Sequence, residues 1–108
     1  MVIKKTSRKI KHKKYYIVRT YSAGVFAGNI VSKKYKDGFF HVVMENARRI
    51  WYWDGAASLS QMAIEGVSKP ENCKFAMPIS TELPNVIEIN ECTAAAEKNI
   101  KDVFIWKR

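Results

Sequence analysis

Residues 29–44 read NIVSKKYKDGFFHVVM, and this stretch decides the fold class. Apolar and β-branched residues stand on both sides of the dipeptide Asp37-Gly38, which readily takes the positive φ angles of a tight reversal. The pattern predicts a solvated hairpin over 33–38, with a strand before it and a return strand over 39–44.

The residues before the hairpin predict a further strand. Residues 15–22 are rich in aromatic and β-branched side chains, which suit a pleated strand better than a helix. Gly24 and Gly28 follow, and glycine at such positions is typical of turns and bulges. We therefore expect a turn and then a bulge or sharp bend between this strand and the hairpin.

Beyond the hairpin the sequence predicts a strand break, another strand and a helix. Asn46 is expected to end the return strand, and residues 48–53, heavy with aromatic rings, are expected to form the next strand. Ser58 and Gln61 have the spacing of a capping box, and Gly66 stands where a helix is expected to stop. The helix between them carries apolar residues on one face, namely Leu59, Met62 and Ala63.

The last third of the chain predicts three short strands and a second helix. The strands are expected at 74–77, 86–91 and 103–106. A connection from Pro78 to Pro84 separates the first two of them. Thr93 is a suitable N-cap for a helix that runs to Lys101.

The order of these elements predicts a single α+β domain over residues 15–108. The connections are short enough for antiparallel pairing. We expect a small, strongly bent antiparallel sheet or half-open barrel of about six or seven strands, with two short helices.

Positive charge is concentrated at the amino end of the chain. Residues 1–36 hold eleven lysines and arginines and no carboxylate, whereas residues 37–108 hold eight bases and ten acids. The first third therefore carries +11 and the remainder −2, which together give the net charge of +9. Such an asymmetry directs electrostatic attraction for anionic partners to one end.

Residues 1–14 predict a flexible basic arm, because they cannot bury enough apolar surface to offset the entropy of ordering them. Nucleic acid or a nucleic-acid-containing host complex is the partner class that this charge favours. An acidic protein surface is one alternative, and a solvated tail without a specific role is another. The cations expected to meet the partner are Lys4, Lys5, Arg8, Lys9, Lys11, Lys13, Lys14, Arg19, Lys33, Lys34 and Lys36.

The sequence offers little for catalysis. A nucleophile would need a histidine and an orienting acid, but His12 lies in the predicted arm and His41 in a predicted strand. There is no HExxH motif and no cluster of metal ligands, and residues 55–58 lack the spacing of a phosphate-binding P-loop. We therefore expect a protein that is not an enzyme and that holds no metal and no cofactor.

One segment suggests a ligand pocket. Strand alternation places Arg49, Trp51 and Trp53 on one face, and the helix that follows begins at Ser58. Indole rings can stack on a base while a guanidinium and helix amides hold phosphate, so a small phosphorylated or nucleotide ligand is one interpretation. The other interpretation is that one or both tryptophans fill the core of a small protein.

Compartment and thiols are the last features that composition addresses. No apolar run approaches the roughly 20 residues that a membrane span needs, and no secretory signal precedes the first predicted strand, so we expect a cytosolic protein. Cys73 and Cys92 are too few for a disulfide framework and are expected to be buried or idle thiols.

Four blocks of sequence carry a resemblance to a known family. They are RTYSAGV at 19–25, NARRIW at 46–51, WDGAASLSQ at 53–61 and PENCKF at 70–75. Over residues 15–106 the chain resembles a family of short, uncharacterised proteins encoded mostly in bacteriophage genomes and known as a domain of unknown function. The resemblance implies a phage gene product in the host cytoplasm, but no reaction and no catalytic residues. The basic arm and the long hairpin at 33–38 depart from the family pattern.

Three functions remain open at this point. The first is an accessory protein in host takeover or counter-defence that binds nucleic acid, or a complex containing it, through the basic arm. The second is the binding or sequestering of a small phosphorylated or nucleotide ligand. The third is a minor virion or assembly protein that uses its sheet edges and Trp106 against other subunits, as a homo-oligomer or in a particle.

Overall fold

The predicted hairpin at residues 29–44 is present in the computed structural model of the protein, which describes residues 13–107. Strand β2 (Val25–Lys36) pairs antiparallel with β3 (Phe39–Tyr52). Asp37 and Gly38 join them with φ angles of 53° and 88°, as expected for a tight reversal between twisted strands. Of the predicted arm, only its last two residues lie within the described part of the chain.

Gly28 marks the bulge that the sequence predicts. Strand β1 (Tyr16–Thr20), shorter than expected, pairs with β2 as far as Gly28, and the register of β2 against β3 shifts between Ala27 and Asn29. A Cβ atom at Gly28 would stand 2.7 Å from the Cα of Ala47. Glycine is therefore needed here because the two backbones approach closely.

Asn46 does not end the return strand, so the prediction of two separate strands on either side of it is wrong. Asn46 takes a φ of 53°. The register of β3 against strand β5 (Ile79–Glu91) shifts between Met44 and Ala47. Asparagine tolerates this left-handed conformation better than most residues. The residue therefore forms an irregularity inside one long strand instead of a boundary.

The proposed connection from Pro78 to Pro84 is also wrong. Strand β5 (Ile79–Glu91) runs through it and pairs first with β3 and then with β1, with Val86 opposite a residue of each. Pro84 is accommodated inside β5, close to the place where the strand changes partner from β3 to β1.

The predicted terminal strand over 103–106 is wrong as well. Strand β4 is only Lys74–Phe75, and its contact with the end of the chain is a single parallel bridge between Phe75 and Ile105. The N–H of Trp106 also donates to the carbonyl of Phe75, at 2.9 Å.

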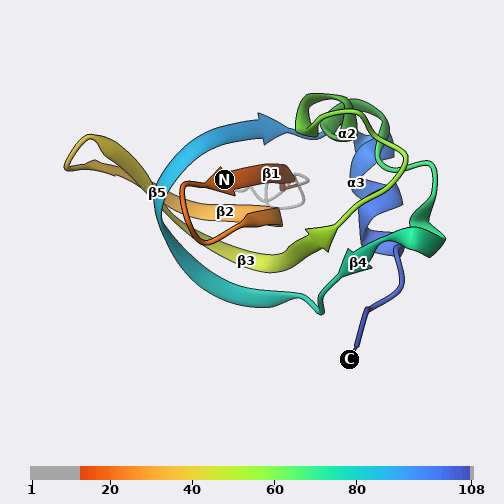
Figure 1. The fold of residues 1–108 in the computed structure, drawn as a ribbon. Helices are drawn as coiled ribbons and strands as arrows, with labels where there is room; N and C mark the ends of the chain where they lie inside the picture. The colour runs from red at the N-terminus through yellow and green to blue at the C-terminus, as the bar shows by residue number, and fades with distance from the viewer. Residues whose placement is uncertain (1–12, 108) are drawn as a thin grey trace, which may run out of the picture.

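The α+β class and the antiparallel sheet with two helices are confirmed, whereas the expected six or seven strands are wrong. Within residues 13–107 the sheet has five strands in the order β2-β1-β5-β3-β4, and β2 also pairs with β3. The pairings of β1, β2, β3 and β5 thus form a closed circuit. Figure 1 shows β5 curving around the other three, with the helices at one end and the β2–β3 hairpin projecting from the other.

Both helices have the caps that the sequence predicts. Helix α2 (Leu59–Glu65) begins after Ser58, whose Oγ accepts from the N–H of Gln61, and it stops at Gly66. Helix α3 (Ala94–Asp102) begins after Thr93, which accepts from the N–H of Ala96.

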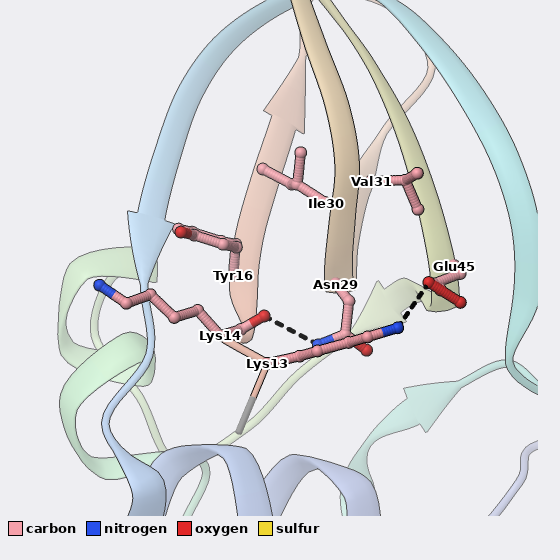
Figure 2. Close-up of a pocket in the computed structure, with 7 residues that line it drawn as sticks. All are labelled: Lys13, Lys14, Tyr16, Asn29, Ile30, Val31 and Glu45. Atoms are coloured by element: carbon pink, nitrogen blue, oxygen red, sulfur yellow. Dashed lines mark hydrogen bonds and ion pairs between the residues drawn. The ribbon is translucent and has the colours of Figure 1, made fainter. Parts of the chain in front are cut away.

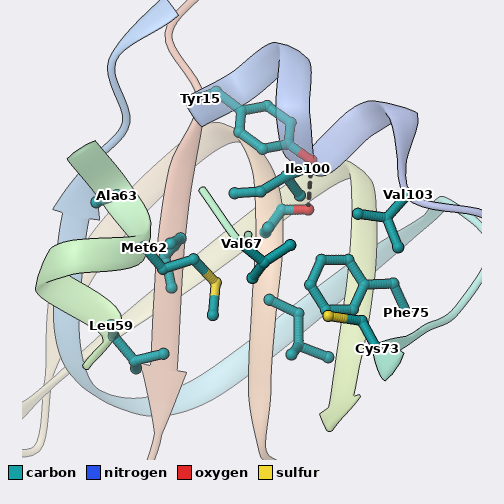
Figure 3. Packing of buried hydrophobic residues seen from close by; sticks show 12 residues of the cluster. Tyr15, Leu59, Met62, Ala63, Val67, Cys73, Phe75, Ile100 and Val103 are labelled. Carbon is teal, nitrogen blue, oxygen red and sulfur yellow. Dashed lines mark hydrogen bonds between the residues drawn. The ribbon is translucent and has the colours of Figure 1, made fainter. Parts of the chain in front are cut away.

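The core has two parts because β1 and the first half of β2 bury residues on both faces. One part lies between the strands and contains Val18, Phe26, Val42, Met44, Ala47, Leu83 and Val86. The other lies between the sheet and the helices, where Tyr15 and Ile17 meet Met62, Ile100 and Phe75 (Figure 3). Helices α2 and α3 thus cover only one side of the sheet.

A buried phenol and a partly buried thiol, both of high pKa, predict a loss of stability in alkali. Desolvation raises the pKa of the Tyr15 phenol well above its ordinary 10.0, and it raises the pKa of the Cys92 thiol to about 12. Both groups are neutral in the fold, whereas the unfolded chain ionises them near their ordinary values. Their contribution is fully present below about pH 9 and is lost as the pH rises through the folded-state values.

We therefore expect the free energy of unfolding, measured with urea, to fall from about pH 9 upward. Tyr15→Phe is expected to make that fall shallower. Tyr21→Phe is the control, because Tyr21 is exposed and its substitution leaves the slope unchanged. Equal slopes for wild type and Tyr15→Phe would contradict the assignment.

Candidate nucleic-acid interface

The tip of the β2–β3 hairpin projects as a two-stranded segment, the ribbon (residues 33–42), with cations on both faces (Figure 1). Lys33, Lys34 and Lys36 are exposed, and within residues 13–107 none of them pairs with a carboxylate. Lys34 lies opposite His41 and Lys36 opposite Phe39, on one face of the ribbon. Since neighbouring side chains alternate, Lys33 lies on the other face.

Aromatic rings stand between these lysines. Tyr35 and Phe40 are cross-strand partners whose rings meet edge to face with centroids 5.3 Å apart, and Tyr35 is 68% exposed. The Nζ of Lys33 lies 5.1 Å from the centroid of the Phe40 ring. Phe39 is exposed as well, so each face of the ribbon presents both a ring and a cation.

Lys13 and Lys14, the last two residues of the predicted arm, are held against the sheet by polar contacts (Figure 2). The Nζ of Lys13 lies 3.1 Å from a carboxylate oxygen of Glu45, and that of Lys14 lies 3.3 Å from one of Glu91. The side-chain amide of Asn29 donates to the Lys14 carbonyl at 2.8 Å. All of these residues except Glu91 line a recess of about 390 Å³ beside the start of β1 and the middle of β2. Because such exposed ion pairs add little stability, phosphate can replace either carboxylate at small cost.

The other predicted cations lie outside the ribbon. Arg19 is on β1, and its Nη1 lies 3.6 Å from a carboxylate oxygen of Glu88. The remaining residues of the arm, Lys4, Lys5, Arg8, Lys9 and Lys11, lie outside the part of the chain that the structure describes. The ribbon is therefore the described surface where predicted cations are left without carboxylate partners.

The four residues of the predicted ligand pocket are divided between two places. Arg49 donates to the Ala23 carbonyl at 2.6 Å, and its Cζ lies 4.5 Å from the Phe26 ring centroid and 5.3 Å from that of Trp51. Trp51 is 60% exposed. The arginine and the first tryptophan thus form a stack at the end of β3.

Trp53 and Ser58 lie together elsewhere. They line a recess of about 430 Å³ with Arg19 and Glu88, and the Trp53 Nε1 donates to the Ala56 carbonyl at 3.2 Å. Strand β3 ends at Tyr52, so the alternation that grouped the tryptophans does not continue to Trp53. Helix α2 has only seven residues, and Ser58 already accepts one of its first N–H groups.

Sequence reasoning missed the most constrained polar residue, Arg48. It is 2% exposed and directs its guanidinium at five backbone carbonyls. These belong to Phe75, Ala76, Ile100, Val103 and Phe104, at distances of 2.7–3.1 Å. The available signal was that Arg48 shares a strand face with the core residue Ile50.

Within residues 13–107, His41 pairs with a carboxylate. Its Nε2 lies 2.7 Å from a carboxylate oxygen of Glu82 at the surface. Residues 13–107 contain no group of three or more histidine, cysteine or carboxylate side chains that could hold a metal ion. In the same residues no helix has the length and apolar character of a membrane span.

The chain matches the model of a known protein family. The profile described as "Domain of unknown function (DUF6948)" matches residues 13–100. The chain belongs to the DUF6948 family. No curated protein and no solved structure matches the chain. The matched residues begin at Lys13 and span both β2 and β3.

Proposed function

We propose that the protein binds nucleic acid, or a complex that contains it, through its basic arm and the β2–β3 ribbon, without catalysing a reaction. The observation that supports this best is the set of three exposed lysines on the ribbon, which have no carboxylate partners among the described residues. Elsewhere, Lys13, Lys14 and Arg19 are each paired. A cation without a carboxylate partner gains most from a phosphate because it gives up no existing ion pair.

The shape of the ribbon supports the same proposal. A two-stranded antiparallel ribbon is narrow enough to enter the major groove of a duplex, and its cations can meet phosphates on either side. The exposed Tyr35 ring also offers a surface on which an unpaired base can stack. As part of the same proposal, supported by the resemblance to phage proteins alone, the binding serves takeover of the host or inhibition of its defence.

The test compares two triple variants that change net charge equally. Lys33→Gln/Lys34→Gln/Lys36→Gln removes the ribbon cations, and Lys69→Gln/Lys98→Gln/Lys107→Gln removes three exposed cations elsewhere. We expect the ribbon variant to lower the slope of log affinity against log salt for duplex DNA by about 2 to 3, since each lost phosphate contact contributes about 0.9. The control variant is expected to keep the wild-type slope.

Removal of residues 1–12 is expected to weaken binding further in the same assay. Electrophoretic mobility shifts at two salt concentrations provide the measurement. Equal slopes for both triple variants would show that only net charge matters, and they would refute a binding role for the ribbon. Absence of binding to duplex and single-stranded oligonucleotides at low salt would refute the proposal as a whole.

A further inference from the structure

A recess of about 370 Å³ is lined in part by the end of α3. Figure 1 shows α3 at the end of the molecule opposite the β2–β3 hairpin. Its walls come from the residue before β1, from β3, from the connection before β5, and from the end of α3 with the residues that follow. They are Tyr15, Asn46, Arg48, Pro78, Lys101, Val103 and Ile105. The size is that of known small-ligand sites.

The recess lies beside an irregular part of the sheet. The β3–β5 ladder begins at the pair Ala47 and Ile79, and Asn46 interrupts it with a positive φ. Pro78, the residue before the ladder, has no N–H with which to extend it. Beyond Pro78 the two backbones meet again, where the N–H of Ala76 donates to the carbonyl of Arg49 at 2.9 Å, so Asn46 and Pro78 line the recess at an irregularity within the sheet.

The lining combines apolar walls with positive charge. Pro78, Val103 and Ile105 supply aliphatic surface, and Ile105 is 45% exposed. No aspartate or glutamate is among the lining residues, whereas Arg48 and Lys101 are. The Nζ of Lys101 lies 5.3 Å from the Tyr15 ring centroid.

The charge of Arg48 is only partly offset. Its five hydrogen bonds go to carbonyls, which carry no net charge, so a unit positive charge remains buried at the base of the recess. Desolvation lowers the pKa of Arg48, which reflects the cost of holding that charge out of water. Lys101 already pairs with Glu97, at 2.6 Å, so the net charge of these three groups is positive.

We propose that this recess binds a small organic anion with one carboxylate or sulfonate group on a flat or aliphatic apolar body. The acid group would lie near Lys101 and the buried guanidinium, and the apolar body would cover Pro78, Val103 and Ile105. The site is separate from the ribbon and does not depend on nucleic-acid binding.

The probes are 2-naphthoate and its uncharged analogue 2-naphthalenemethanol, titrated into the full-length protein and followed by ¹H–¹⁵N NMR. We expect the amides of Asn46, Val103 and Ile105 to shift with 2-naphthoate, and the anion to bind about fivefold more tightly than the alcohol. Lys101→Gln keeps a hydrogen-bonding group for Glu97 and is expected to reduce that preference about threefold. Lys98→Gln, on the same helix, is the matched control and is expected to retain it.

Ile105→Glu tests the apolar wall, because it places a carboxylate on a residue that is partly exposed and tolerates a polar group. It is expected to abolish 2-naphthoate binding while the remaining amide shifts report an intact fold. The proposal is overturned if the three amides do not move at about millimolar 2-naphthoate, or if wild type binds both probes equally. Binding that persists unchanged in Ile105→Glu would place the probe elsewhere and would also overturn it.

Discussion

Arg48→Met is expected to lower the free energy of unfolding by at least about 3 kcal/mol, the largest loss from any single side chain in the domain. The methionine would fill much of the same space but donate nothing, so five carbonyls would lose a charged donor together. Three of these carbonyls lie at the end of α3 or just after it, and two belong to β4 and the residue that follows. The substitution therefore removes hydrogen bonds that hold three parts of the chain together, namely β3, the β4 region and the end of α3.

Arg48→Lys is expected to recover only part of this loss, because lysine has three donors on a single nitrogen and cannot reach carbonyls on different segments. The matched control is Arg49→Met on the next residue. Arg49 makes one recorded hydrogen bond and is partly exposed, so its loss is expected to cost about 1 kcal/mol. Urea unfolding measures all three variants, and similar losses for Arg48→Met and Arg49→Met would contradict the role assigned to Arg48.

Gly55→Ala is expected to destabilise the protein by about 3 kcal/mol, for two separate reasons. Gly55 has a φ of 94°, which strains any residue with a Cβ atom. The added Cβ would also stand 2.5 Å from the amide nitrogen of Ser68, whose N–H donates to the Gly55 carbonyl. Either the backbone at residue 68 must move or that hydrogen bond must break.

Gly38→Ala separates the two effects. Gly38 has a similar φ of 88°, but nothing lies within 4 Å of its added Cβ. We expect this control to cost only about 1 kcal/mol of backbone strain, as measured by thermal or urea unfolding. If the two alanine variants are equally destabilised, steric contact at residue 68 plays no part.

Local signals predicted the hairpin and the helices correctly. The Asp37-Gly38 reversal and the caps at Ser58 and Thr93 depend on residues close to one another in the chain. Asn46 and Pro84 are local signals as well, but tertiary pairing accommodates both inside long strands. Strand pairing over long separations decides such cases, and periodicity in a short window carries no information about it.

The candidate site was predictable to a similar extent. The ribbon lysines follow directly from the hairpin pattern, because a tight reversal exposes the residues beside it. The separation of Trp53 from Trp51 could not be predicted, since it required knowing that β3 ends at Tyr52. Nor could the sequence show that Arg48 and Arg49, identical neighbours, serve a buried carbonyl cluster and a surface stack respectively.

The double pairing of β5 has a consequence for how the protein is made. Tyr16 pairs with Gly28 on one side and with Glu91 on the other, so β1 gains its second partner only when the far end of the domain has been synthesised. The hairpin can form early, but an unfinished chain that stops before residue 79 leaves Val18 and Val42 facing water. Folding is therefore expected to be completed only after β5 has been synthesised, at the slow rate typical of long-range strand pairing.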